Sequence, residues 1–412
     1  MLFLICISFI KLILSYLDKA RLHTAIKLDN GNFIIFTGNG QYTMDQEFKI
    51  LYNRTTNVTG QLNYYDRAKQ FSKEEEGYIL YITNLNHYIL NSYGNLLFST
   101  SISNALYNYD YSVIPYNYLK DELNYYIIYF YNSSQIIFKK YSYNSTDENF
   151  QNEDFYSNNV YGHEKNFISC QLMKYSNEKF ISCFFLTHLN KEYFINCTVF
   201  KSEENFKLFQ TSQIKIEASS FYRLESEVIS NNERQKALIV LSITYNKINY
   251  LFYAGYDINI NNFTSYGYLN ENNCTLYSGY NYYIGNSYFK ETEEFIVSAI
   301  SQCTFNNISQ YAYLIYSFDN NFEYSFYGIL GDLVLGDSCC KSEAIKIYEK
   351  SINSILFSSV AQKYCIISNL NSSNIISSFI INKEINIINP TELKSTDSPP
   401  EYIEFLNNRR LL

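Results

Sequence analysis

Residues 176–185 read SNEKFISCFF, a polar turn that runs directly into a short apolar stretch. Related stretches follow the same order along the chain: DNGNFIIFTG (29–38), NERQKALIVLSI (232–243), KETEEFIVSAIS (290–301) and EKSINSILFSS (349–359). The apolar runs are short, are bounded by Asn, Asp, Ser and Gly, and lack a sustained 3.6-residue period. Each such stretch therefore predicts a turn followed by a β-strand.

The apolar runs recur at a spacing that indicates seven structural units. The residues that align at the runs are Phe33, Tyr78, Tyr126, Phe180, Leu238, Phe295 and Ile355. Successive steps between them are 45, 48, 54, 58, 57 and 60 residues. Within a unit, one strand precedes the polar turn and the aligned run is the second strand. An aromatic third strand follows, and an Asn- or Phe-containing turn leads into a weaker fourth strand.

Composition agrees with a β-rich chain that folds around a large core. Hydrophobic residues make up 47% of the 412 residues and charged residues 17%, which argues against both disorder and a membrane bundle. The chain holds 44 Tyr and 31 Phe, residues that favour half-buried strands. Its net charge is −8, and a basic stripe for nucleic acid is missing from the sequence.

The first residues predict export. Residues 1–17 are apolar except for Lys11 and two serines, and the run is shorter than the roughly 20 residues of a bilayer span. We interpret residues 1–20 as a signal peptide cleaved between Ser15 and Ala20; a buried first strand or an uncleaved anchor is the alternative. Residues 389–412 read as a linker or tail. The mature chain is then secreted or held at the cell surface through partners.

Cysteine use agrees with export. Eight cysteines lie beyond the predicted signal peptide, an even number that would suit a disulfide framework. A tight hairpin centred near Ser176 would place Cys170 opposite Cys183, although Cys183 could instead face Cys197 across the next turn. The eight disulfide candidates are Cys170, Cys183, Cys197, Cys274, Cys303, Cys339, Cys340 and Cys365.

Nine N-x-S/T sequons are available for glycosylation if the chain enters a secretory pathway. Their acceptor residues are Asn53, Asn57, Asn132, Asn144, Asn196, Asn262, Asn273, Asn307 and Asn371. A sequence this rich in Asn, Ser and Thr produces about as many by chance, so the number is not evidence of modification.

Seven units of about four strands resemble a β-propeller, in which blades stack around an axis and close into a ring. The resemblance covers residues 23–383 and concerns architecture, because the blade signatures of named subfamilies are missing from the sequence. We place the propeller at residues 21–388. A tandem of β-sandwich domains of about 100 residues each is the alternative fold.

Motifs for catalysis, cofactors or metal ions are not found in the sequence, so we assign no catalytic, cofactor-binding or metal residue. The four histidines, His23, His87, His163 and His188, are scattered and are expected at the surface or in caps. Tyr-, Asn- and Ser-rich segments such as 272–288 suit a binding surface. The sequence therefore predicts a non-enzymatic module that binds a protein or glycan partner. A secreted carbohydrate-active hydrolase, with carboxylates and arginines at the channel mouth, is the alternative.

Overall fold

In the computed structural model the chain forms seven antiparallel sheets, each built from consecutive strands and numbered here 1 to 7 in chain order. The structure describes these strands and some of their turns between Leu22 and Ile388. Residues 1–21, residues 389–412 and the other connections lie outside the described part, and with them the predicted signal peptide and tail.

Sheets 1 to 3 contain four strands each: β1 (Leu22–Lys27), β2 (Phe33–Thr37), β3 (Gly40–Met44) and β4 (Ile50–Arg54); β5 (Arg67–Phe71), β6 (Tyr78–Ile82), β7 (Asn86–Asn91) and β8 (Leu96–Ser101); β9 (Tyr111–Leu119), β10 (Glu122–Tyr131), β11 (Gln135–Asn144) and β12 (Asn149–Ser157). Sheets 4 and 5 repeat this order: β13 (Ile168–Tyr175), β14 (Glu178–Leu189), β15 (Glu192–Lys201) and β16 (Lys207–Ile216); β17 (Ser220–Val228), β18 (Lys236–Tyr245), β19 (Ile248–Asp257) and β20 (Asn262–Leu269).

Sheets 6 and 7 have five strands rather than the predicted four: β21 (Cys274–Leu276), β22 (Ile284–Phe289), β23 (Glu294–Phe305), β24 (Ile308–Phe318) and β25 (Tyr324–Leu333); β26 (Lys346–Tyr348), β27 (Ser354–Val360), β28 (Tyr364–Asn371), β29 (Asn374–Ile381) and β30 (Ile387–Ile388). The extra strand of sheet 6 arises because β21 and β22 both pair with β23, one after the other along its length.

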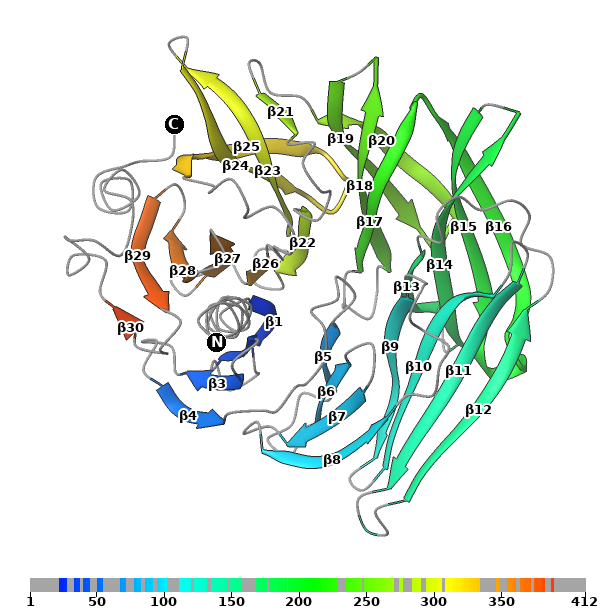
Figure 1. Ribbon diagram of the computed structural model, residues 1–412. Coiled ribbons are helices and arrows are strands. Elements are labelled where there is room, and N and C mark those ends of the chain that lie inside the picture. The colour runs from blue at the N-terminus through cyan, green and yellow to red at the C-terminus, as the bar shows by residue number, and fades with distance from the viewer. Residues whose placement is uncertain are drawn as a thin grey trace, which may run out of the picture.

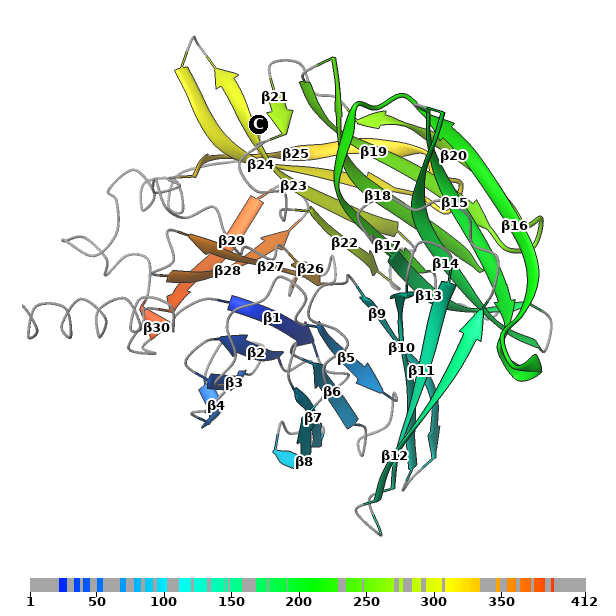
Figure 2. The ribbon, with the colours of Figure 1, turned by 45° about the vertical axis from the view of Figure 1, so that its right-hand side comes forward.

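The seven sheets close into a ring around a central axis (Figures 1 and 2). Their innermost strands contact one another in sequence, from β1 through β5, β9, β13, β17 and β22 to β26, and β26 contacts β1 again. The fold is thus a seven-bladed β-propeller, as the repeat predicts, and not a tandem of sandwiches. Sheet 1 uses only strands from the start of the chain, so the ring closes by contact between β1 and β26 without exchanging a strand.

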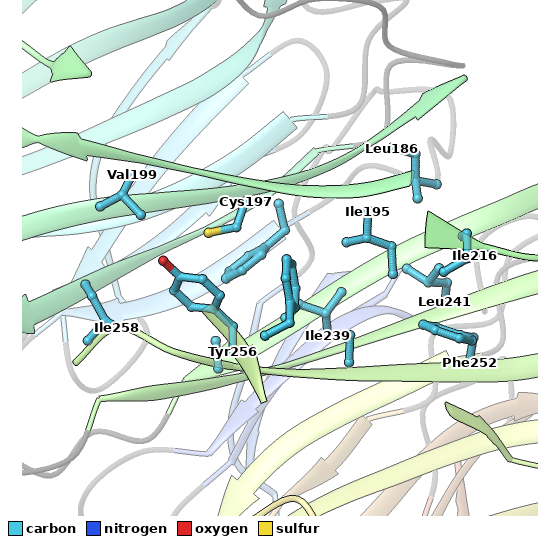
Figure 3. Close-up of a cluster of buried hydrophobic side chains, with 14 of the residues drawn as sticks. Leu186, Ile195, Cys197, Val199, Ile216, Ile239, Leu241, Phe252, Tyr256 and Ile258 are labelled. Atoms are coloured by element: carbon cyan, nitrogen blue, oxygen red, sulfur yellow. The ribbon is translucent and has the colours of Figure 1, made fainter. Parts of the chain in front are cut away.

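The core lies between the sheets, and alternation along the second strand of each sheet builds it. In β18, Ile239 and Leu241 pack against sheet 4, whereas Leu238 and Val240 pack against sheet 6. Both faces are buried, which explains why the second strands are the most apolar stretches of the sequence. Every anchor of the repeat lies on the strand that pairs with the innermost strand of its sheet, which is the second strand except in sheet 6, where it is β23. Figure 3 shows the layer between sheets 4 and 5.

A phenylalanine in the turn before the last strand of a sheet, or at the start of that strand, seals several of these layers. Phe206, Phe263 and Phe322 are buried in the cores that join sheets 4, 5 and 6 to the sheet before each of them. Two of them, Phe206 and Phe322, have left-handed backbones with φ of 57° and 63°. That conformation costs roughly 1–3 kcal/mol for a bulky residue, a cost that burial of the ring offsets. The Asn- and Phe-containing turn of the repeat is therefore a packing element.

Candidate binding surface

A group of exposed and half-buried side chains, most of them aromatic, lies along the seam between sheets 4 and 5. Its members face the partner sheet from the second, third and fourth strands, at the end of the propeller that holds the β14–β15 and β18–β19 turns. We call this group the tyrosine surface; it consists of His188, Tyr193, Tyr245, Ile248, Tyr250, Tyr266 and Tyr268.

The outer strand β20 supplies the two most exposed tyrosines of the surface. Tyr266 is 56% exposed and Tyr268 is 37% exposed, while Leu269 beside them is buried. Tyr268 pairs with Phe252 of β19, whose ring belongs to the core between sheets 4 and 5. Because β20 is the outer strand, residues that would be buried on an inner strand remain at the solvent boundary here.

Hydrogen bonds and ring contacts hold the tyrosines in place. The Tyr268 hydroxyl donates to the carbonyl of Glu217 at 2.8 Å, and its ring packs edge-on against Tyr250 and Phe252 with centroids 5.9 and 5.2 Å apart. The Tyr193 hydroxyl donates to the carbonyl of Ser219 at 3.2 Å. Both phenols are therefore bound to residues 217–219, the segment that links sheet 4 to sheet 5.

The linking segment is itself fixed to the next sheet. The backbone N–H and the hydroxyl of Ser219 both donate to the carbonyl of Thr244, at 2.7 and 2.9 Å. The Thr244 hydroxyl then donates to the Asn249 side chain at 2.6 Å. The rings thus stand on a connected frame that needs little ordering when a ligand binds.

The turns beside the surface present amides in a conformation that asparagine tolerates. Asn190 follows β14 and Asn246 follows β18, with φ of 52° and 50°, and both are exposed. Asn visits this left-handed region more readily than most residues because its short side chain bonds locally. These positions add adaptable hydrogen-bonding groups at the rim of the tyrosine surface.

Charge at the surface is modest. Lys215 of β16 and Glu192 of β15 form an exposed ion pair with Nζ and Oε1 2.5 Å apart. Partial burial, followed by the nearby charge of Glu217, raises the pKa of Tyr268 above its ordinary value, so this phenol remains a hydrogen-bond donor. The surface therefore offers ring faces and neutral polar groups rather than a strong field.

The cysteine predictions have two outcomes. Cys170 pairs directly with Cys183, as the predicted hairpin requires, and both side chains lie in the core between sheets 3 and 4 as thiols. The alternative pairing of Cys183 with Cys197 is wrong: Cys183 stands opposite Thr198, and Cys197 faces the opposite side of the sheet (Figure 3). Cys197 pairs with Phe184, one residue beyond Cys183, so the two thiols lie on opposite faces of the sheet.

Sequence reasoning did not anticipate a second pair. The backbone register sets Cys274 of β21 opposite Cys303 of β23, the same relation as between Cys170 and Cys183. The intervening strand β22 hides this pairing in the sequence. Cys365 lies on β28 opposite Ser359, whereas Cys339 and Cys340 lie outside the described residues.

The sequons fall in different settings. Asn144 and Asn262 border turns between third and fourth strands, and Asn196 lies within β15. Asn53 lies on β4 and Asn371 ends β28. The other four acceptors, Asn57, Asn132, Asn273 and Asn307, lie outside the described residues.

The remaining predicted groups do not assemble around the tyrosine surface. Arg54, Arg67 and Arg223 lie on β4, β5 and β17 of three different sheets. His87 is fully buried between sheets 2 and 3, so the surface or capping role expected of it is wrong. Of segment 272–288, the structure describes the backbone of β21 and β22 only, and its predicted binding role stays a prediction.

Comparisons with known proteins do not assign the chain to a family. Neither a protein-family model nor a curated protein matches it. Similar solved structures include the WD40 domain of SCAP from fission yeast, with 9% identity over 84% of this chain and 93% of that one, at a TM-score of 0.40. An Aleuria aurantia lectin bound to Fucalpha1-6GlcNAc has 9% identity over 76% and 95%, at 0.42.

A third similar structure, Kuenenia stuttgartiensis hydrazine synthase, has 9% identity over 90% of this chain and 97% of that one, at a TM-score of 0.47. These similarities are weak, and the proteins differ from one another in what they do. The function of this chain therefore has to be argued from its own surface.

Proposed function

We propose that the protein is an extracellular, non-enzymatic binding module that holds a carbohydrate on the tyrosine surface. The observation that carries the proposal is the row of tyrosines along one seam, of which Tyr266 and Tyr268 are exposed and the others are half-buried. Such a surface binds a ligand through contact area and hydrogen bonds and needs no groups that transfer protons or electrons.

The chemistry of the surface matches a sugar. Tyr266, Tyr245 and Tyr250 make no hydrogen bond through their hydroxyls to the described part of the chain, so these phenols remain available as donors and acceptors. A pyranose ring has an apolar face of C–H groups and a rim of hydroxyls. Ring faces surrounded by phenols and asparagine amides satisfy both parts of such a ligand.

The extent of the surface favours a carbohydrate over a protein partner. A protein interface of standard size buries about 800 Å² and roughly 20–30 residues on each partner. The tyrosine surface comprises seven residues along one seam, with Ile248 as its single aliphatic member. A few sugar units would cover this area, whereas a stable protein interface would extend well beyond it.

The extracellular setting rests on the sequence, through the apolar residues 1–17 and the even number of remaining cysteines. The Cys170–Cys183 register supports it, because a cross-strand pair on one face has the geometry that oxidation would need. We infer that these two thiols form a disulfide in the exported protein. In the described residues, no helix is long and apolar enough to cross a membrane.

The test is a glycan array probed with the full chain, followed by affinity measurements on the sugars it retains. Tyr266→Ala removes the most exposed ring of the surface and should weaken binding about tenfold or more. Tyr324→Ala is the matched control. Tyr324 is 43% exposed, but it begins β25 of sheet 6 and does not belong to the tyrosine surface. This control should bind as the unmodified chain does.

Two results would contradict the proposal. Equal affinity of the Tyr266→Ala and Tyr324→Ala variants would separate sugar binding from the tyrosine surface. Binding to displayed extracellular proteins but to no glycan, with loss in Tyr266→Ala alone, would assign the surface to a protein partner instead.

A further inference from the structure

We propose that Asn262 is an N-glycan acceptor of the exported chain, whereas Asn196, the acceptor of an equally valid sequon, stays unmodified. The two sequons, Asn262-Phe263-Thr264 and Asn196-Cys197-Thr198, are indistinguishable by the sequence rule. Their places in the fold are opposite in every respect that matters for a bulky modification. The proposal depends on entry into a secretory pathway and is independent of sugar binding at the tyrosine surface.

Asn262 is exposed at the start of the outermost strand of sheet 5. Its Oδ1 accepts the N–H of Phe263 at 2.9 Å, while its Nδ2, the atom that would carry the glycan, donates to no group in the described part of the chain. Thr264, the third residue of the sequon, is exposed as well. The folded sheet therefore accommodates a glycan here without moving a strand.

The neighbourhood of Asn262 gives a glycan there a physical role. Ile260, two residues earlier, is 62% exposed, and β20 presents the open edge of its sheet. Open edges and exposed aliphatic side chains favour association with other chains. A hydrated glycan at the start of β20 would cover both. Tyr266 lies four residues further along β20, about 13 Å at the usual rise of a strand, so the attachment point lies apart from the tyrosine surface.

Asn196 has the opposite environment. It lies on β15, which is paired on both sides, and its Nδ2 donates to the Thr187 hydroxyl at 2.7 Å and, at 3.4 Å, to the carbonyl of Phe194. Cys197 is 0% and Thr198 is 3% exposed. A glycan on Asn196 would break these hydrogen bonds and enter the space between sheets, so a chain modified there could not complete its fold.

The modification is a transfer from a lipid pyrophosphate-linked oligosaccharide. The Asn262 Nδ2 forms a bond to the anomeric carbon of the first sugar as the bond from that carbon to the pyrophosphate oxygen breaks. The amide loses one proton to a base of the transferase, and the lipid pyrophosphate leaves.

The experiment is secretion of the full chain from a eukaryotic cell line, with glycopeptide mapping after enzymatic deglycosylation in ¹⁸O water. Asn262 should convert to labelled Asp, and Asn196 should remain Asn. Thr264→Ala, which keeps Asn262 but destroys its sequon, should reduce the intact mass by one glycan. Asn196→Gln should leave the number of glycans unchanged. The same map, run without reductant, reads the state of Cys170 and Cys183.

An unmodified Asn262 in the secreted, folded protein would overturn the proposal, and so would a glycan on Asn196. Loss of secretion in the Thr264→Ala variant would support the covering role of the glycan if refolded, deglycosylated chain aggregates. Retention of a soluble monomer after deglycosylation would contradict that role.

Discussion

Gly255 shows how a single residue limits the contact between two blades. It lies on β19, and a Cβ built on it would come within 2.2 Å of Cδ2 of Phe322, the turn phenylalanine of sheet 6. The ring of Phe322 therefore occupies the space that any side chain at 255 would need. The turn is also fixed from sheet 5, since Lys236 Nζ donates to the carbonyl of Asn320 at 2.5 Å.

We predict that Gly255→Ala destabilises the protein by about 1–3 kcal/mol, the usual cost of overpacking a filled core. Gly267→Ala is the matched control, because its Cβ would meet Tyr253 Cε1 at 3.3 Å, a contact that a small shift of the ring relieves. Urea unfolding of both variants measures the difference. Equal losses of stability would show that Phe322 does not pack on Gly255. Phe322→Ala should suppress the effect of Gly255→Ala in a double-mutant cycle.

His87 is a second residue whose environment has a measurable consequence. It is buried between sheets 2 and 3, where its Nδ1 and the Tyr125 hydroxyl form a hydrogen bond and its Nε2 has no partner among the described residues. Burial, with a smaller contribution from the charge of Lys139, lowers the pKa of His87 from 6.5 to about 3. The folded protein therefore keeps this imidazole neutral, while the unfolded chain protonates it below about pH 6.5.

Because the folded pKa is the lower one, the stabilisation is present above pH 6.5 and is lost as the pH falls towards 3. As the pH falls from 7 to about 4.5, His87 should lower the free energy of unfolding by about 2.5 kcal/mol. Urea unfolding at the two pH values, on the parent and on His87→Phe, isolates this contribution from that of the carboxylates. The parent should lose more stability than the variant. The same loss in both proteins would mean that His87 is solvated.

At the scale of the element, the repeat was predictable because each strand and turn is encoded locally. Short apolar runs bounded by Asn-rich turns identify the second strands, and the hairpin length fixes Cys170 opposite Cys183. The turn before the last strand is also local: between β24 and β25, Asp319 Oδ1 accepts the N–H groups of Asn321 and Glu323 at 2.8 and 2.9 Å.

What the elements do to one another could not be read from the same pattern. The buried position of Phe322 depends on sheet 5, and the opposite facing of Cys183 and Cys197 depends on a register offset of one residue. The tyrosine surface combines strands of two sheets with the segment that links them, so its members are spread over 81 positions from His188 to Tyr268. Alternation predicts that Tyr266 and Tyr268 lie on the same face of their strand, but they form a site only together with the residues of sheet 4 across the seam.

At the scale of the molecule, the ring closes between its first and last sheets by packing alone. Each sheet is completed by its own consecutive strands, and β1 reaches both β26 and β27. The closure gives every sheet two neighbours, which is why the second strands can be apolar on both faces. The seam that bears the tyrosine surface is held in place by the same circular arrangement.

The closed ring is the central claim, and cross-linking of the native monomer tests it most directly. Lys27 ends β1 and Lys346 begins β26; the ring brings these two strands into contact, although 319 positions separate the two lysines. An amine-reactive cross-linker, applied to a mixture of ¹⁴N- and ¹⁵N-labelled chains, distinguishes links within one chain from links between chains. The account predicts a Lys27–Lys346 link within single chains. Consistent absence of this link, with links found only between sheets that follow each other in the chain, would indicate an open row of sheets and contradict the propeller.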